Sequence, residues 1–279
     1  MVSLCLAVLS SSLVSIVMRL SGSRVKHNLG MLTMNYIVCA LLSGSFGGFQ
    51  GAFDLSEPSI GLALVMGTVN GVLYLAGFML MQHNIQKNGV VLSSIFQKLG
   101  LLVTLVVSVV FYREIPDLLQ GAGFVLAVAA IILMNYQKGS GSAGSRGWLI
   151  AMLLSCGLGD AMAKIFTESG PVALENQFLF YTFGVAMLLC GVCMTVKDQK
   201  IGKEEAMFGI LIAVPNFFSS KFLLGALESL SAVIVYPVFS VGSILMVTLA
   251  GVLAFRERLS VRQWIAMAAI LVALVLLNI

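Results

Sequence analysis

Three lysines lie inside long apolar stretches of this sequence. Lys98 lies about eight residues into the apolar run 90–112, which contains the stretch SIFQKLGLLVTLVVSVVFY (94–112). Lys164 and Lys221 lie nearer the ends of their apolar runs. A cation at the centre of a lipid-facing helix costs about 2.5–3.5 kcal/mol. Lys98 is roughly 12 Å deep, too deep for easy snorkelling. We expect Lys98 to line a cavity and bind an anionic group; the alternative is a structural hydrogen bond to a neighbouring helix.

Lys164 and Lys221 have a competing explanation, because both are close enough to a helix end to snorkel. Lys164 follows Asp160 at the i, i+4 spacing, which favours an ion pair on one helix face. The alternative for Asp160 and Lys164 is a role in proton or ion coupling, in which Asp160 takes up a proton and the substrate releases Lys164. Lys221 follows Asn216 and two serines within about a turn, which gives that part of the helix a polar surface.

Amide and phenol groups in other apolar runs add candidates that would orient a ligand. Asn70 and Tyr74 lie four residues apart, and Tyr236 precedes a proline that can open a kink beside a cavity. Such groups are equally suited to hydrogen bonds between helices. The candidate substrate-binding residues are Lys98, Lys221, Tyr236, Asn216, Asn70 and Tyr74. Gly67 and Gly71 form a GxxxG pattern that predicts close helix packing.

The composition shows which elements must position these groups. Hydrophobic residues make up 59% of the 279 residues and charged residues 10%, and the mean hydropathy is +1.03. A soluble domain would be about half apolar and roughly a quarter charged, so the chain is predicted to be an integral membrane protein. Its five cysteines all lie in apolar runs and are expected to pack as small hydrophobes.

The apolar runs predict ten membrane-spanning helices, since a helix needs about 20 apolar residues to cross a bilayer. The predicted spans are 3–20, 30–50, 60–82, 90–112, 117–136, 147–167, 176–196, 206–226, 231–254 and 261–278. Twelve Lys and Arg residues then lie on the side opposite the termini, one (Arg113) lies on the terminal side, and three lie within spans. The positive-inside rule therefore predicts termini outside the cell, with the chain in the plasma membrane. Because the basic residues occupy gaps between spans, we infer no nucleic-acid binding.

The two halves of the chain resemble each other. A shift of 143 residues aligns 93–124 with 236–267, as the following identities show: Phe96 with Phe239, Leu102 with Leu245, Arg113 with Arg256, Glu114 with Glu257, and Gln120 with Gln263. We expect two five-helix repeats, 1–137 and 148–279, joined by a Gly/Ser-rich linker at 138–147. Since five is odd, the repeats must be inverted, an architecture that secondary transporters use.

The repeated segment resembles the closing part of the EamA module of the drug/metabolite transporter superfamily. Pro237 enters the penultimate span, Glu257 ends it, and Gln263 leads the final span; the first half has Glu114 and Gln120. Ser94 replaces the proline there. The resemblance covers essentially the whole chain and implies a ten-helix basket with a central cavity, alternating access and a small metabolite as substrate. It also implies cytoplasmic termini, which the charge count contradicts.

No catalytic motif is present, so we expect a transporter and not an enzyme. HExxH, GxSxG and P-loop patterns are absent, and the two histidines, His27 and His83, are expected in loops. Repeated Glu114 and Glu257 are interpreted as anchors at helix ends. We predict no cofactor and no metal. The predicted function is alternating-access transport of a small anionic or zwitterionic metabolite; the alternatives are export of cationic drugs and a non-transporting membrane scaffold or receptor. We leave open whether the protein forms a homodimer.

Overall fold

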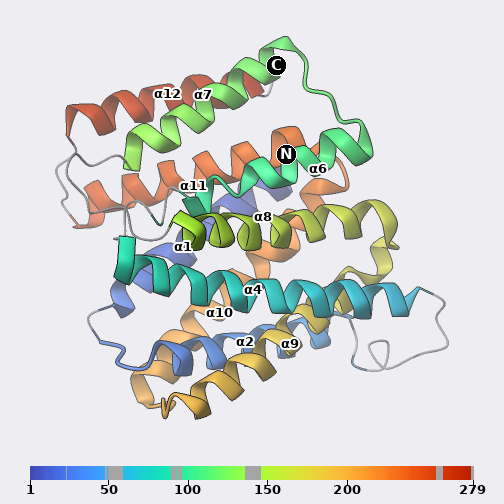
Figure 1. Cartoon of the computed structure of the whole chain (residues 1–279), viewed down its shortest axis with the longest axis vertical. Coiled ribbons are helices and arrows are strands. Elements are labelled where there is room, and N and C mark those ends of the chain that lie inside the picture. The colour runs from blue at the N-terminus through green and yellow to red at the C-terminus, as the bar shows by residue number, and fades with distance from the viewer. Residues whose placement is uncertain are drawn as a thin grey trace. The chain divides into compact units, whose positions relative to one another are not determined.

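The computed structural model describes residues 1–22, 24–47, 49, 59–88, 93, 96–135, 146–255 and 260–277, and the regular secondary structure of this part of the chain is all helical (Figure 1). Ten α-helices occur there: α1 (Val2–Ser21), α2 (Asn28–Gly47), α4 (Ile60–Asn88), α6 (Leu101–Tyr112), α7 (Leu118–Asn135), α8 (Arg146–Ser169), α9 (Glu175–Val196), α10 (Lys203–Leu227), α11 (Ala232–Phe255) and α12 (Val261–Leu277). A short 3₁₀ helix, Val172–Leu174, precedes α9.

These helices confirm the all-α membrane fold. Seven of the described helices are long and apolar enough to cross a bilayer, and the shorter apolar helices Phe96–Tyr112, Leu118–Leu133 and Val261–Leu277 occupy the remaining predicted spans. Three details differ from expectation. α4 continues to Asn88, so His83 lies in a helix and not in a loop; the run at 90–112 is interrupted at Leu99–Gly100; and α8 begins at Arg146, within the predicted linker. Residues 136–145 of that linker and Glu257 lie outside the described residues.

The chain divides into two compact units, each made of two separate stretches of sequence. Unit 1 comprises Met1–Leu75 and Ile165–Glu228, and unit 2 comprises Ala76–Lys164 and Ser229–Ile279. Each unit therefore takes helices from both sequence halves. The structural units are not the sequence repeats, because inverted repeats fold by packing against each other.

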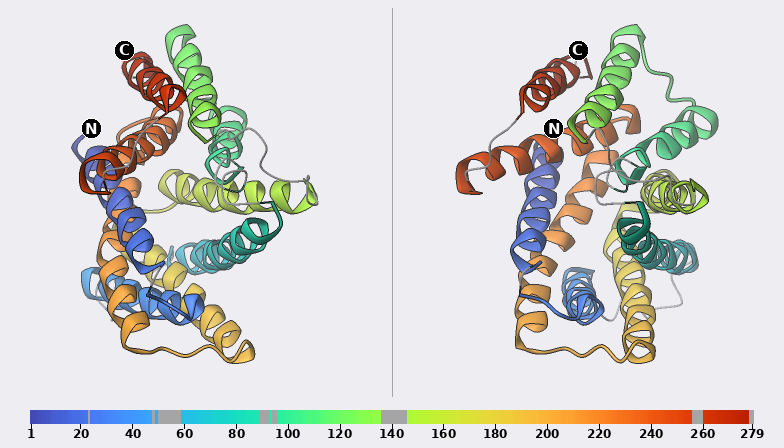
Figure 2. Two further views of the ribbon diagram at one scale, coloured as in Figure 1. Left: turned by 90° about the vertical axis from the view of Figure 1, so that its left-hand side faces the viewer. Right: turned by 60° about the vertical axis from the view of Figure 1, so that its left-hand side comes forward.

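In unit 1, α2 packs against α9 and α10, and α1 packs against α10 (Figures 1 and 2). The first part of α4 also packs against α9, at the GxxxG pattern. A Cβ on Gly67 would lie 2.8 Å from the Phe178 carbonyl oxygen, and one on Gly71 would lie 2.6 Å from that of Thr182. Only glycine permits this backbone approach, so the packing role predicted for the pattern is confirmed.

In unit 2, α7 and α12 lie side by side, and α11 packs against α6, α7 and α12 (Figure 2). A Cβ on Gly123 of α7 would lie 2.9 Å from the Leu276 Cβ of α12. By their order within the two repeats, α7 corresponds to α12 and α2 corresponds to α9. Each unit thus contains one closely packed pair of repeat-equivalent helices, as a two-fold relation between inverted halves requires.

Candidate functional site

One face of α8 carries three ionisable groups. Cys156, Asp160 and Lys164 are spaced four residues apart and so lie on one side of this helix. Their neighbours come from α4, from the segment that leads into α6, and from α11. These contacts bring several of the predicted site residues close to one another.

The segment that carries Lys98 is interrupted directly after it. Residues 96–98 are helical, and the chain then turns at Leu99–Gly100 through i→i−3 hydrogen bonds: Gly100 N donates to the Gln97 carbonyl at 3.1 Å and Leu102 N to that of Leu99 at 3.0 Å. Such a tightened turn often marks a functional site within a helix. Pro237 lies inside α11, the corresponding helix of the second half, which continues from Ala232 to Phe255.

Glycine-to-glycine contact fixes this turn against α8. A Cβ on Gly100 would lie 3.0 Å from the Gly157 nitrogen, and a Cβ on Gly157 would clash with the Gly100 carbonyl oxygen. The Thr104 hydroxyl donates to the Gly157 carbonyl at 3.2 Å. On the opposite flank, the Cys156 sulfur would lie 3.1 Å from a Cβ on Gly77 of α4. Backbone proximity, more than side-chain packing, therefore places Lys98 beside α8.

Lys98 and Asp160 interact electrostatically, and Cys156 lies near both. The two charged side chains are half-buried. The Tyr236 hydroxyl of α11 donates to the backbone carbonyl of Asp160 at 2.5 Å, and the Tyr236 side chain is buried. Three predicted site residues, Lys98, Asp160 and Tyr236, thus meet at one turn of α8.

Lys164 lies one helical turn further along and has a different ionic partner. Its ammonium pairs with Glu114 Oε1 at 2.5 Å and lies 5.6 Å from the centre of the Tyr112 ring. The other carboxylate oxygen, Glu114 Oε2, accepts a hydrogen bond from Ala232 N at 2.7 Å, at the start of α11. Lys164 is 1% exposed and Glu114 17%. Lys164 therefore has an ionic partner, Glu114, that comes from another segment of the chain.

Sequence reasoning missed this bridging role of Glu114, which had been interpreted as an anchor at a helix end. Arg113, directly before it, ends α6 in the left-handed conformation with φ 55° and ψ 30°. This conformation is uncommon for a residue with a side chain, and here it reverses the chain so that Glu114 turns toward α8 and α11. The repeated Arg-Glu pair was the available signal, since it marks a position that both halves retain.

The predicted site residues of unit 1 lie mostly in contacts between helices. Asn216 Nδ2 of α10 donates to Asn35 Oδ1 of α2 at 3.3 Å and approaches the Cys39 sulfur at 3.8 Å. Asn35 and Cys39 are buried. Asn216 therefore lies in a contact between α10 and α2.

Asn70 and Tyr74 of α4 both face α9. Asn70 Nδ2 donates to the Thr182 hydroxyl at 3.4 Å, and the Tyr74 ring packs edge-on against Phe183 at 6.2 Å. Tyr36 of α2 also stacks on Phe183, with 6.4 Å between the two ring centres. The Asn70 side chain is 3% exposed.

Lys221 lies over aromatic rings. Its ammonium is 4.0 Å from the centre of Phe46 and 5.8 Å from that of Phe217, and it interacts electrostatically with Glu175. Cation–π contacts of this kind contribute about 0.5–2 kcal/mol. These contacts stabilise the half-buried ammonium of Lys221 within unit 1.

The structure therefore divides the candidates in two. Lys98, Asp160, Lys164 and Tyr236 belong to unit 2, and Asn70, Tyr74, Asn216 and Lys221 belong to unit 1. Among the described residues, no group of three or more His, Cys, Asp and Glu could hold a metal ion.

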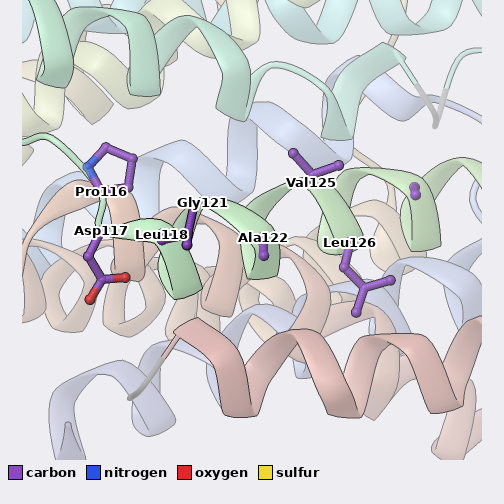
Figure 3. A pocket seen from close by; sticks show the side chains of 8 residues that line it. Pro116, Asp117, Leu118, Gly121, Ala122, Val125 and Leu126 are labelled. Carbon is purple, nitrogen blue, oxygen red and sulfur yellow. The ribbon is translucent and has the colours of Figure 1, made fainter.

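Two grooves on helix surfaces contain none of these residues. A groove of about 720 Å³ follows α7, where Figure 3 shows Gly121, Ala122, Val125 and Leu126, with Pro116 and Asp117 in the segment before it. A second groove, of about 540 Å³, lies between α1 and α10 and is almost entirely apolar. Both have the surface expected of helix faces that contact lipid.

The ten apolar helices of the described residues define a multi-pass membrane fold. A family model described as the EamA-like transporter family matches residues 1–136 and again 146–279, and the chain belongs to this family. It is a multi-pass integral membrane protein, and the family is not an enzyme family. An uncharacterised protein of Haemophilus influenzae is 26% identical over 277 residues, covering 94% of this chain and 92% of the relative. A solved crystal structure matches 99% of this chain and 94% of its own with a TM-score of 0.76 at 14% identity, which supports the fold.

Proposed function

We propose that this EamA-family transporter carries a small anionic or zwitterionic metabolite by alternating access, with Lys98 binding the negative group. The observation that carries the proposal is the position of Lys98, half-buried in an apolar span directly before the turn at Leu99–Gly100. Non-helical backbone within a span is tolerated only where it is buried in protein or lines a water-filled cavity. Tyr236 and the unit 1 candidates Asn70, Tyr74, Asn216 and Lys221 are further binding candidates.

Asp160 supplies a coupling mechanism. In the absence of substrate it offsets the charge of Lys98. When Asp160 takes up a proton, Lys98 loses this partner and an anionic substrate group can replace it. Proton and substrate then favour each other's binding, since coupling between two sites is reciprocal. This mechanism moves the proton and the substrate in the same direction.

Ligand-dependent thermal unfolding of the detergent-purified protein tests the binding role. A panel of amino acids, organic acids, nucleosides and phosphorylated compounds is compared on the wild type, Lys98→Ala and the control Lys87→Ala, whose lysine is exposed near the end of α4. A ligand at a hundredfold its Kd should stabilise the native state by about 2.7 kcal/mol. We expect an anionic or zwitterionic compound to stabilise the wild type and the control but not Lys98→Ala. Stabilisation by a cation in all three proteins would favour drug export instead.

Transport into proteoliposomes tests the coupling. In Asp160→Asn the residue is permanently neutral, so Lys98 is free at every pH. We expect this variant to bind the substrate without dependence on pH and to accumulate none in response to a proton gradient. Accumulation driven by the gradient in this variant would exclude Asp160 as the proton site.

The excess of Lys and Arg on one side supports external termini in the plasma membrane. A reporter that is active only in the cytoplasm, fused after Ile279, should therefore be inactive. An active fusion would reverse the proposed orientation and leave the binding proposal unchanged.

A further inference from the structure

Two loops of unit 1 meet at the end where α1 leads into α2 and α9 leads into α10. Glu205, in the first turn of α10, accepts hydrogen bonds from Lys26 N at 3.0 Å and from His27 N at 3.2 Å. The Gln199 side chain accepts one from Leu29 N at 2.9 Å. These bonds to backbone N–H groups hold the two loops against each other.

The joined loops carry an excess of positive charge. Residues 19–27 and 197–205 contain six basic and three acidic residues. The basic residues, which we call the basic cluster, are Arg19, Arg24, Lys26, Lys197, Lys200 and Lys203, and all six are exposed. Glu205 is buried against the backbone N–H groups, so Asp198 and Glu204 remain to oppose the cluster at the surface. Clusters of four to eight Lys and Arg beside a membrane-spanning helix favour anionic lipid headgroups.

The apolar groove between α1 and α10 begins close to the basic cluster. Val17, near the end of α1, and Ile210 of α10 line the part of the groove nearest the two loops. Lys203 precedes Ile210 by seven residues, so it lies on the same face of α10, about 10 Å along the helix. A charged group and an apolar groove therefore follow one another along a single helix face.

The groove suits one acyl chain in both length and polarity. Along α10 it extends from Ile210 to Phe222, which at twelve residues is about 18 Å. One leaflet contributes about 15 Å to a hydrocarbon core of roughly 30 Å. Except for Ser10, the residues that line the groove are apolar. An acyl chain that begins near the first turns of α10 would thus be covered along the depth of one leaflet.

From this arrangement we infer that unit 1 binds an anionic phospholipid, with the headgroup at the basic cluster and one acyl chain in the groove between α1 and α10. The site is separate from the proposed substrate site and does not depend on it. A second copy of the chain fits this surface less well. A two-fold axis along the membrane normal would bring two basic clusters together at the same depth, and their charges would repel each other.

Lipid titration of the purified full-length protein in detergent tests the inference. Dioleoylphosphatidylglycerol, which is anionic, is compared with dioleoylphosphatidylcholine, which has the same chains and no net charge. Binding is measured by lipid-dependent thermal unfolding, and native mass spectrometry counts the lipids that stay bound. Glycerol 3-phosphate, which has the phosphate but no acyl chain, is the competitor that tests for a site specific to free phosphate.

The triple variant Arg24→Gln, Lys26→Gln, Lys203→Gln tests the headgroup contact. Its control is Lys87→Gln, an exposed lysine near the end of α4 on the same predicted side of the membrane. Each basic residue near an anionic headgroup contributes about fivefold in affinity. We therefore expect the wild type and the control to bind phosphatidylglycerol at least about tenfold more tightly than phosphatidylcholine, whereas the triple variant should bind the two lipids about equally.

Val214→Phe tests the acyl-chain contact, because it places a larger side chain at a groove position that is 44% exposed. Its control is Val192→Phe, at a position of α9 that is 61% exposed and lies outside the groove. Val214→Phe should weaken the binding of both lipids, and Val192→Phe should weaken neither. Both valines are exposed, so both variants are expected to fold.

Several results would overturn the inference. Equal binding of the two lipids by the wild type would do so, as would a tenfold preference that survives in the triple variant or disappears equally in Lys87→Gln. Competition by glycerol 3-phosphate would indicate a site for free phosphate. An affinity for phosphatidylglycerol that Val214→Phe leaves unchanged would remove the acyl chain from the groove, and a dimer that Val214→Phe disrupts would assign the groove to a second copy.

Discussion

Glu114 joins three structural elements, and its replacement by glutamine should therefore be unusually costly. The carboxylate balances the charge of Lys164, which is 1% exposed, and accepts the Ala232 N–H at the start of α11. Glu114→Gln keeps the shape but removes the charge and one acceptor. Breaking a buried ion pair on one side costs about 3–5 kcal/mol, because the remaining ion stays buried without a counter-charge.

The double variant Glu114→Gln, Lys164→Met separates the ion pair from the helix cap. It removes the stranded ammonium but leaves glutamine to accept from Ala232, so most of the lost stability should return. The residual loss should be about 1 kcal/mol, the typical contribution of a helix cap. The expected order of stability is thus the wild type, then the double variant, then Glu114→Gln.

Thermal unfolding in detergent measures these differences. With about 2–4 °C per kcal/mol for proteins of 150–250 residues, Glu114→Gln should lower Tm by on the order of 10 °C. Glu204→Gln, an exposed glutamate in the first turn of α10, is the control and should change Tm by no more than a degree or two. A Glu114→Gln protein as stable as this control, or a double variant no more stable than the single one, would refute the reasoning.

Further substitutions test the local geometry. Gly157→Ala should lower Tm by several degrees and impair transport, because its Cβ would clash with the carbonyl of Gly100, whereas Gly184→Ala, whose Cβ would meet no atom within 4 Å, should leave both unchanged. Arg113→Gly should be neutral or stabilising, since glycine adopts φ 55° freely, whereas Arg113→Val should lower Tm by several degrees. Tyr236→Phe removes the hydrogen bond to the Asp160 carbonyl and should cost about 1 kcal/mol in the same unfolding assay.

The sequence was enough to predict the fold because each span leaves a strong local signal. Apolar length and the gaps between runs gave ten helices, and the repeat between residues 93–124 and 236–267 gave their inverted arrangement. Glycine spacing at Gly67 and Gly71 correctly indicated close packing. Apolar runs, glycine spacing and the repeat can all be recognised in the sequence without knowing which helices are neighbours.

The pairing of charges could not be predicted in the same way. The i, i+4 spacing of Asp160 and Lys164 correctly placed them on one face of α8, but spacing on one helix does not identify neighbours from other helices. Lys98 lies about sixty residues before Asp160 in the chain, and it arrives there through the contact between Gly100 and Gly157. That contact has no pattern in a single sequence, since an isolated glycine in an apolar run fits many roles.

The different surroundings of Lys98 and Lys164 predict opposite effects when each lysine is removed. Removing Lys164 leaves Glu114 as a carboxylate among α6, α8 and α11, where it must still hold the Ala232 N–H, so Lys164→Met should destabilise the ligand-free protein. Removing Lys98 leaves Asp160, which can take up a proton and become neutral, so Lys98→Met should be neutral or stabilising without ligand. Groups kept for function often reduce stability in this way. Equal losses of Tm in the two variants would mean that Lys98 is as structural as Lys164, and the binding role proposed for it would have to be abandoned.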